Sequence, residues 1–466
     1  MKNEKFKAGV ILSLPDLYRR NMPDFTKNLA EYWKSVLPGL FGESNFIVTE
    51  TAHTKEEFEK AVSLCEINEC RVIVLIPMAY TSSGAAVPVL KLTKLPLIIV
   101  STSRDTPLPY TMDGDHLLAN QAMHGVQDIC NGLWRQEKPY IVISGHPEQN
   151  LFENRFKKAL RAADGTWILK NGKIGQLGGF FPDMLDFLYD SKLQSIILGY
   201  KKINLNIDSY LLSTKDIPKN DIANLITWMK KMFSVDKDLQ LFELELAAKY
   251  SIAFEALQKE FDLDGLGMNF MGLIDGGAKS LPFLGADRLM AGGYGYAGEG
   301  DVQTAALMAA LMKITPGTTF SEMFCPDYER DEIMLSHMGE CNFDLANPSK
   351  AIFLKARPFA WGECERLAVP VFQLKPGQVT IIAITQEPEN CENFRLIVCL
   401  ADVIEAPDHV NLLNPHSRIV VKRPVHEFIE AYSNAGGPHH LCVSYGDIRE
   451  EVKWITELTG INYIGL

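Results

Sequence analysis

The first third of the chain alternates continuously apolar runs with segments of helical periodicity. The apolar runs have strand length: AGVILSL, FIVTE, RVIVLIPM, PLIIVST and YIVISG. Between them, apolar residues recur at helical spacing, as at Phe25, Leu29, Trp33 and Leu37. Strands that are apolar on both faces and alternate with helices indicate a parallel sheet covered on both sides. We therefore predict a doubly wound α/β domain over residues 1–150.

The same alternation continues into a second predicted α/β domain, residues 151–318. NRFKKALRAADG and DLQLFELELAAKYSIAFEALQKEFDLD predict helices, SIILGY predicts a strand, and VQTAALMAALMKI predicts an alanine-rich helix.

Residues 319–466 form the third predicted domain, and most of this segment no longer alternates strand and helix patterns. Short runs separated by turn residues predict antiparallel strands of a barrel or a sandwich: AIFLKA, VPVFQL, QVTIIAIT, FRLIVCLADVIEA and SRIVVKR.

Composition and charge argue against some classes of binding partner and indicate where the protein is located. The chain has 466 residues, of which 47% are hydrophobic and 22% charged, and its net charge is -12. An acidic surface argues against nucleic acid or an anionic membrane as the main partner. The first apolar run is too short for a signal peptide, and no run reaches transmembrane length. Nine scattered cysteines without a C-x-x-C pair fit reduced thiols, so we expect a cytoplasmic protein.

The stretch GGYGYAGEGD contains a match to G-x-G-x-x-G at Gly293, Gly295 and Gly298. A dinucleotide-binding loop follows a strand, whereas the preceding LPFLGADRLMAGG reads as a helix. Glu299 would also face the pyrophosphate and repel it. We therefore favour a second interpretation, in which the glycines allow a sharp turn that presents Glu299, and Asp301 caps the next helix.

Carboxylates and imidazoles downstream of this turn make a candidate site for a divalent metal. Glu299, Glu322 and His337 are joined by the adjacent pair His439 and His440. Mixed oxygen and nitrogen ligands suit Mn²⁺, with Mg²⁺, Co²⁺, Fe²⁺ or Zn²⁺ as alternatives. These residues come from separate segments, so their spacing alone does not establish a site.

The chain resembles the L-arabinose isomerase family along most of its length. The run LPFLGADRLMAGGYGYAGEGDVQTAAL is similar to the central signature of that family. PGTTFSE, LSHMGE and AGGPHH follow in the family's order, and NQAMHG upstream is similar to its N-Q-x-x-H-G. The resemblance implies two α/β domains followed by a C-terminal domain with an antiparallel β-barrel. It also implies an aldose–ketose isomerase of arabinose catabolism, dependent on Mn²⁺ and assembled as a trimer or hexamer.

The same resemblance assigns roles to individual residues. It implies metal ligands at Glu299, Glu322, His337 and His440, with the two glutamates also acting as the catalytic acid/base pair. It implies substrate contacts at His439 and at His124, the latter across a subunit boundary. Two further substrate-contact candidates, Asp16 and Tyr18, follow the first predicted strand, where parallel sheets bind ligands.

Aldose–ketose interconversion moves a proton between two carbons through an enediolate. That reaction needs a base, an acid and a Lewis acid that polarises the carbonyl, and these residue types supply them. The chain departs from the family at Met323 and Phe324, where a carboxylate and a phenol are usual, and at Pro15, where a glutamine is usual. These departures leave two alternatives to an enzyme that acts on L-arabinose. One is an isomerase of an L-fucose-like or D-arabinose-like sugar, and the other is a non-catalytic sugar-binding protein of the same fold.

Overall fold

The computed structural model describes residues 6–360, 362–409 and 411–466. The chain folds into two compact units. The N-terminal unit comprises Lys2–Trp167 and Glu451–Gly460, and the C-terminal unit comprises Ile168–Glu450 and Ile461–Leu466. The three-domain boundaries expected from the sequence stay a prediction.

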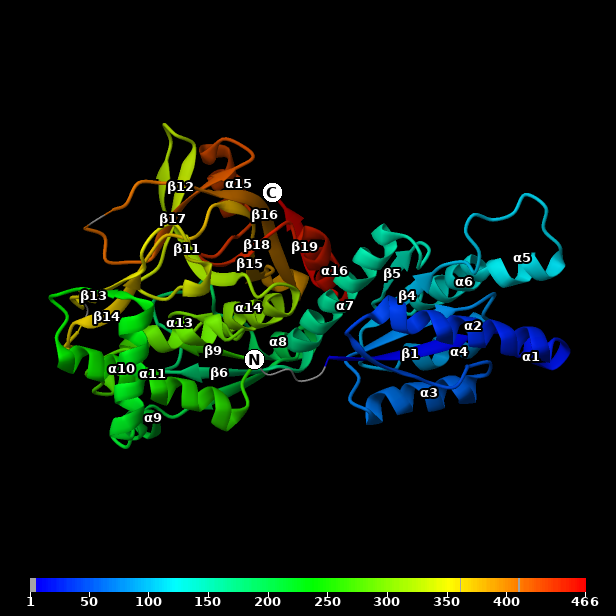
Figure 1. Cartoon of the computed structure of the whole chain (residues 1–466), viewed down its shortest axis with the longest axis horizontal. Helices are drawn as coiled ribbons and strands as arrows, with labels where there is room; N and C mark the ends of the chain where they lie inside the picture. The colour runs from blue at the N-terminus through cyan, green and yellow to red at the C-terminus, as the bar shows by residue number, and fades with distance from the viewer. Residues whose placement is uncertain (1–5, 361, 410) are drawn as a thin grey trace. The chain divides into compact units, whose positions relative to one another are not determined.

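A five-stranded parallel sheet forms the centre of the N-terminal unit, as predicted (Figure 1). Its strand order is β2-β1-β3-β4-β5. The strands are β1 (Lys7–Ser13), β2 (Asn45–Val48), β3 (Val72–Pro77), β4 (Leu97–Ser101) and β5 (Ile141–Ser144). Because the strands are parallel, the segments that follow them, including the residues after β1, meet at one edge of the sheet.

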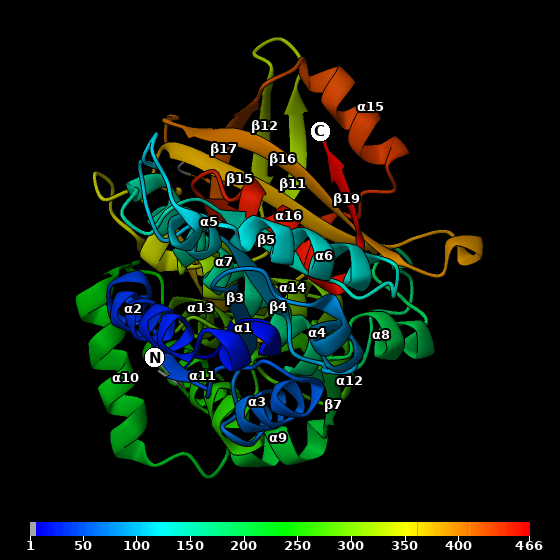
Figure 2. The same cartoon turned by 90° about the vertical axis from the view of Figure 1, so that its right-hand side faces the viewer.

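Helices cover both faces of this sheet. They are α1 (Asp16–Asn21), α2 (Pro23–Phe41), α3 (Lys55–Ile67), α4 (Ser83–Leu90), α5 (Gly114–Asn120), α6 (Ala122–Trp134), most of α7 (Asn150–Asn171) and most of α16 (Arg449–Thr459). Side chains of α3, α4 and α6 form one core with Ile11, Ile73 and Leu75 of the strands. Helix α2 lies on the other side of β3 and β4 from α4 and α6 (Figure 2). This part of the chain has the predicted doubly wound architecture.

The C-terminal unit contains a second parallel sheet, with strand order β10-β9-β6-β7. Its strands are β6 (Lys173–Leu177), β7 (Lys201–Leu205), β9 (Gly265–Met268) and β10 (Gly295–Ala297). Its helices are α8 (Ser191–Ile197), α9 (Ile207–Ser213), α10 (Lys219–Met232), α11 (Leu241–Phe261), α12 (Phe270–Asp275), α13 (Phe283–Ala291) and α14 (Val302–Ile314).

The strand predicted at SIILGY is wrong, because the first half of this segment, residues 195–197, is the end of helix α8 and the rest is not a strand. Asp190 caps that helix, accepting hydrogen bonds from the backbone N–H groups of Lys192 at 2.7 Å and Leu193 at 3.3 Å. A short apolar run does not distinguish a strand from a buried helical turn. The cap is what begins a helix here.

Six antiparallel strands close into a barrel in the last part of the chain, which confirms the predicted barrel (Figure 2). Around the barrel the order is β15-β18-β11-β12-β17-β16, with β15 and β16 paired, and β19 adds to β16 in parallel. The strands are β11 (Thr318–Asp327), β12 (Glu332–Ser336), β15 (Gly377–Gln386), β16 (Phe394–Ile404), β17 (His416–Val421), β18 (His440–Tyr445) and β19 (Asn462–Gly465). Helix α15 (Val425–Asn434) packs against the barrel core through Val425 and Phe428.

Two of the predicted C-terminal strands lie outside the barrel. AIFLKA and VPVFQL form β13 (Phe353–Arg357) and β14 (Leu367–Val371), which join β8 (Ser234–Val235) in a separate sheet of order β14-β13-β8. Pro370 occupies the edge strand of this sheet, where its missing N–H interrupts no ladder. Two short 3-10 helices, Phe343–Leu345 and Glu389–Cys391, complete the elements.

Helix α14 lies between the parallel sheet and the barrel. It packs against β6, β9 and β10 on one side and β11, β15 and β18 on the other. Nearly all of its residues are therefore buried, which explains why its sequence is apolar on every face. The turn that begins this helix thus meets the barrel wall. Among the described residues, no helix combines the length and apolarity needed to span a membrane.

Candidate metal centre

Glu299 lies in the turn between β10 and α14, at the carboxyl end of a parallel strand. Its φ of 51° is in the left-handed region, which non-glycine residues rarely adopt and which recurs at functional sites. A Cβ on Gly300 would lie 1.9 Å from the carbonyl oxygen of Gly179, and one on Gly298 would lie 3.0 Å from Cε1 of His337. The glycines of this motif therefore allow close packing around Glu299, which supports the interpretation favoured over a dinucleotide site.

Barrel pairing brings the other predicted ligands to this turn. Glu322 on β11 is the direct cross-strand partner of His440 on β18. On its other side, Glu322 pairs with Ser336, the last residue of β12, and His337 follows immediately. The register of three barrel strands thus places one carboxylate and two imidazoles together.

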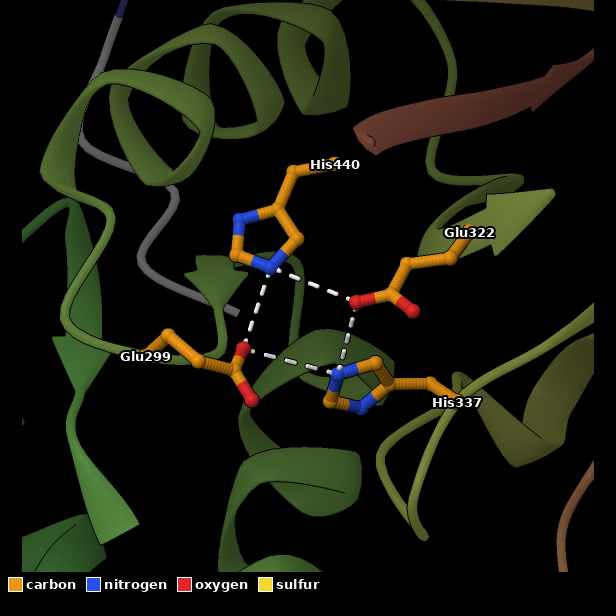
Figure 3. Close-up of side chains that lie close together, drawn as sticks. All are labelled: Glu299, Glu322, His337 and His440. Atoms are coloured by element: carbon orange, nitrogen blue, oxygen red, sulfur yellow. Dashed lines mark hydrogen bonds and ion pairs between the residues drawn. The ribbon is translucent and has the colours of Figure 1, made fainter. Parts of the chain in front are cut away.

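The four side chains form a closed ring of contacts, here called the metal cluster (Figure 3). Nε2 of His440 lies 3.0 Å from Oε2 of Glu299 and 3.4 Å from Oε1 of Glu322. Nε2 of His337 lies 3.6 Å from the same Glu299 oxygen and 3.3 Å from the same Glu322 oxygen. One potential ligand atom from each residue therefore faces a common centre.

The spacing of these atoms fits a divalent ion. All four lie within 4.8 Å of one another. Two ligands at roughly 2.1 Å from one ion are about 3.0 Å apart at a right angle and about 3.4 Å apart at a tetrahedral angle. Three of the four contacts, at 3.0, 3.3 and 3.4 Å, lie in this range, and the contact between His337 and Glu299 is slightly longer at 3.6 Å. The donor set, two carboxylate oxygens and two imidazole nitrogens, suits Mn²⁺ and related metals.

Buried carboxylates hold both histidine rings from behind. Nδ1 of His440 lies 2.9 Å from Oδ2 of Asp301, and Nδ1 of His337 lies 2.7 Å from Oε2 of Glu340. The Tyr296 hydroxyl donates a hydrogen bond to the other oxygen of Glu340, at 3.0 Å. A carboxylate at Nδ1 fixes the ring and directs Nε2 toward the metal. Asp301 also caps α14 as predicted, with its other oxygen.

Sequence reasoning missed Glu340 and Tyr296. A signal was available for Glu340, because it follows His337 by three residues in LSHMGE. The role of Tyr296 depends on the fold, because it reaches Glu340 from β10. Aromatic rings complete the surroundings: Phe187 stacks on His440 at 4.9 Å, and Phe320 contacts His337 edge-on at 4.6 Å.

The electrostatics of the metal cluster follow from this burial and pairing. Burial alone would raise the pKa of Glu299, but the two neighbouring imidazoles lower it to about 2. The pKa of Glu322 is held well below its usual range by the same imidazoles, again against the effect of burial. Burial disfavours a charged imidazole, yet the surrounding carboxylates raise the pKa values of His337 and His440 well above the usual range. Without a metal, the carboxylates and the imidazoles of the cluster therefore favour each other's charged forms.

His439 lies at the edge of the metal cluster. Its Nε2 is 3.8 Å from Oε1 of Glu322, and its Nδ1 is 2.5 Å from Oδ2 of Asp186. Burial acts to raise the pKa of Asp186, but hydrogen bonds from His439 lower it to about 2. The side chains of His439 and Asp186 are more exposed than those of the cluster, of which Glu322 is the most exposed at 15%.

The remaining predicted substrate residues belong to the N-terminal unit. Asp16 begins α1 and pairs with arginines of that helix, accepting from Nε of Arg19 at 3.0 Å. The Tyr18 hydroxyl accepts a hydrogen bond from Nε2 of Gln121 at 2.6 Å, and the Gln121 carbonyl accepts one from the backbone N–H of His124. His124 is exposed in the first turn of α6. The structure thus brings Tyr18 and the His124 turn together through Gln121.

Comparison with known proteins relates most of the chain to one family. Residues 191–317 match the L-arabinose isomerase central domain, and residues 317–462 match the L-arabinose isomerase C-terminal domain. The L-arabinose isomerase of Shouchella clausii is 26% identical over 407 residues, covering 85% of this chain and 82% of that protein. The L-arabinose isomerase of Thermotoga neapolitana is 25% identical over 430 residues, covering 90% and 84%.

A solved structure also shows weak similarity, an ABC transporter solute-binding protein from Burkholderia multivorans. It is 12% identical, covering 67% of this chain and 95% of that chain, with a TM-score of 0.18. A TM-score of this size carries no argument about fold or function.

Proposed function

The chain is a divergent member of the L-arabinose isomerase family, and thus an aldose–ketose isomerase, and we propose that it depends on a divalent metal ion held by the metal cluster. The observation that carries the proposal is the convergence of four ligand atoms within 4.8 Å. Mn²⁺ is favoured by the ligand set. The carboxylates of Asp301 and Glu340 and the aromatic contact of Phe187 support metal binding, because they hold the histidine rings in the orientation that ligation needs.

Glu299 and Glu322 are proposed as the acid/base pair that moves a proton between two sugar carbons through an enediolate. The contacts within the metal cluster use only Oε2 of Glu299 and Oε1 of Glu322. Each carboxylate therefore keeps a second oxygen that could accept or donate a proton. A bound divalent ion would polarise the carbonyl and stabilise the enediolate oxygens as a Lewis acid. In the metal-free protein the two neighbouring imidazoles lower the pKa of Glu299 to about 2, so its carboxylate is ionised and available as a ligand.

Sugar contacts are proposed for His439, His124, Asp16 and Tyr18. His439 is placed for this role because its Nε2 faces Glu322 at 3.8 Å. His124 is assigned by the family resemblance, and Asp16 and Tyr18 by their position after the first strand of the parallel sheet. We further propose a homo-oligomer, a trimer or hexamer in the cytoplasm, in which His124 serves the site of a neighbouring subunit.

The sugar itself is either L-arabinose or a related aldose that is L-fucose-like or D-arabinose-like. Met323 favours a changed preference, because it replaces a polar residue and lines an apolar cavity of about 400 Å³ together with His439. Against this, Met323 follows Glu322 on a strand and so points to the opposite face from it.

A screen of L-arabinose, L-fucose and D-arabinose tests the proposal. The protein is stripped with a chelator and assayed with and without Mn²⁺, with the product identified chemically. We expect conversion of at least one aldose to its ketose, and only with a divalent metal. Equal turnover by the stripped protein would contradict metal dependence. The absence of any product from this panel with Mn²⁺ bound would contradict the proposed substrate class.

Metal content supplies a second readout. His440→Ala should empty the site, since it removes one of four ligands. His439→Ala is the matched control, because it changes the adjacent histidine, which faces Glu322 from the edge of the cluster. It should lower activity more than metal content. If His439→Ala empties the site and His440→Ala does not, the two roles are reversed.

A further inference from the structure

The loop between β6 and α8, residues 178–190, is attached to the turn that carries Glu299. The backbone N–H of Phe181 donates to the carbonyl oxygen of Glu299 at 3.0 Å. The side-chain amide of Gln303, in the first turn of α14, donates to the carbonyl oxygen of Phe187 at 3.0 Å. Phe187 in turn stacks on His440. These two hydrogen bonds and the stacked rings therefore fix the position of the loop relative to the metal cluster.

Asp186 lies in this loop and binds His439 at two points. Oδ2 of Asp186 accepts a hydrogen bond from the backbone N–H of His439 at 2.9 Å and lies 2.5 Å from its Nδ1. A carboxylate can only accept, so Nδ1 of His439 carries the proton. This arrangement fixes the orientation of the ring and leaves Nε2 directed at Oε1 of Glu322, 3.8 Å away.

The gap between His439 and Glu322 matches a substrate group. A separation of 3.8 Å is too long for a direct hydrogen bond. A sugar hydroxyl that enters beside the gap could donate its proton to Nε2 of His439, which accepts because the ring proton is on Nδ1. The side chains of His439 and Asp186 are 37% and 38% exposed, so the dyad is open to an incoming ligand.

We propose that Asp186 is a positioning residue for the isomerase reaction, holding the His439 ring so that Nε2 contacts a sugar hydroxyl beside Glu322. The inference rests on the proposed function, because it assumes that a sugar binds at the metal cluster. An interaction between two partly exposed polar side chains, such as Asp186 and His439, contributes little to stability. The main effect of losing Asp186 should therefore appear in activity and not in folding.

The test is a double-mutant cycle with Asp186→Ala, His439→Ala and the double variant. Activity is measured with Mn²⁺ on L-arabinose, L-fucose and D-arabinose. We expect Asp186→Ala to lower kcat/KM by about 10- to 100-fold with metal content unchanged, the usual cost of losing such a partner. The double variant should be no worse than His439→Ala, because Asp186 acts through that ring. Asp186→Asn keeps an acceptor oxygen and should lose less than Asp186→Ala.

Asp183→Ala is the matched control, since it changes an exposed aspartate of the same loop. It should leave kcat/KM unchanged. Additive losses in the cycle, or an equal loss in Asp183→Ala, would show that Asp186 only maintains the loop and would overturn the inference.

A crystal structure of the Asp186→Ala variant gives a readout that needs no turnover. The inference expects the His439 ring to leave its position facing Glu322, and a ring that stays there overturns it. Absence of turnover in the unmodified protein would contradict the proposed function alone.

Discussion

The metal cluster and the predicted sugar contacts of the N-terminal unit differ in how firmly the fold holds them. His440 and His337 are 0% and 3% exposed, whereas the Asp16 side chain is 29% exposed and His124 is on the surface. Each cluster histidine has a buried carboxylate behind it. Asp16 instead pairs with arginines of its own helix, an arrangement that would stabilise a helix start without any ligand.

This contrast indicates which property of the enzyme is free to change. A buried cluster tolerates few substitutions, because removing one member leaves another polar group unpaired in a low dielectric. Exposed residues carry no such penalty. By resemblance to the family, the four cluster residues are kept, whereas one departure, Phe324, is 38% exposed and another, Pro15, is buried beside the partly exposed Asp16. We therefore expect the chemistry to be the family's and the sugar preference to be the part that varies.

Replacing either cluster glutamate should have the largest effect. Glu299→Gln and Glu322→Gln keep side-chain shape but remove a proton acceptor and a metal ligand. Each should lower kcat by at least about 10²-fold, and up to about 10⁴-fold, the range for a general acid or base. Steady-state kinetics at saturating Mn²⁺ separate the catalytic loss from weaker metal binding. A variant that retains near-normal kcat when loaded with Mn²⁺ removes that residue from proton transfer.

Much of the fold could be predicted from apolar patterning, because continuous apolar runs and helical spacing directly reflect two-sided and one-sided burial. The apolar run SIILGY was ambiguous for that reason, since both a strand and a helical turn bury it. The four ligands came from recognisable motifs. Their geometry could not be predicted, because the pairing of Glu322 with His440 depends on barrel register between segments far apart in sequence. The loop carrying Asp186 has no periodicity to interpret.

Binding of Mn²⁺ should depend steeply on pH. Because the pKa values of His337 and His440 are raised, we expect each of the two rings to be in its protonated form in the metal-free protein at neutral pH. A metal binds only the neutral rings, so each must release its proton. Affinity should therefore rise with pH, by up to about 100-fold per pH unit while both rings are protonated.

Isothermal titration in buffers of different ionisation enthalpy measures the protons released. We expect up to about two per Mn²⁺ near neutral pH. His337→Gln replaces one titrating ring with an amide oxygen that can still ligate weakly, so at Mn²⁺ concentrations that load the site it should lower this number by about one. His426→Gln, at a surface position, should leave the number unchanged. Binding without any proton release would contradict the charge state assigned to the metal cluster.

Subunit mixing tests whether the two regions act in the same chain. His124→Ala is expected to lower activity about tenfold or more through loss of a sugar contact. When it is mixed with Glu299→Gln under conditions of subunit exchange, sites that combine an intact cluster with a neighbour's intact His124 should recover up to about a quarter of normal activity.

The control for this mixture is Glu299→Gln with Glu322→Gln. Both residues belong to one metal cluster built within a single unit, so exchange should restore nothing. Recovery in this control, or none in the His124 mixture after exchange is demonstrated, would contradict a site shared between subunits.

Substituting Met323 is expected to have the smallest effect, and that effect should be on the preference for one sugar over another. Met323 and Phe324 replace two polar groups, and Met323 lines the apolar cavity that His439 also borders. We predict weaker activity on L-arabinose than on a sugar with a less polar distal end, such as L-fucose. Because Met323 faces away from Glu322, Met323→Thr should shift the ratio of kcat/KM values by no more than about tenfold, the low end for one apolar contact. The sugar preference is measured by comparing kcat/KM for L-arabinose, L-fucose, D-arabinose and L-ribulose. Efficient turnover with a clear preference for L-arabinose would show that these replacements leave sugar recognition unchanged.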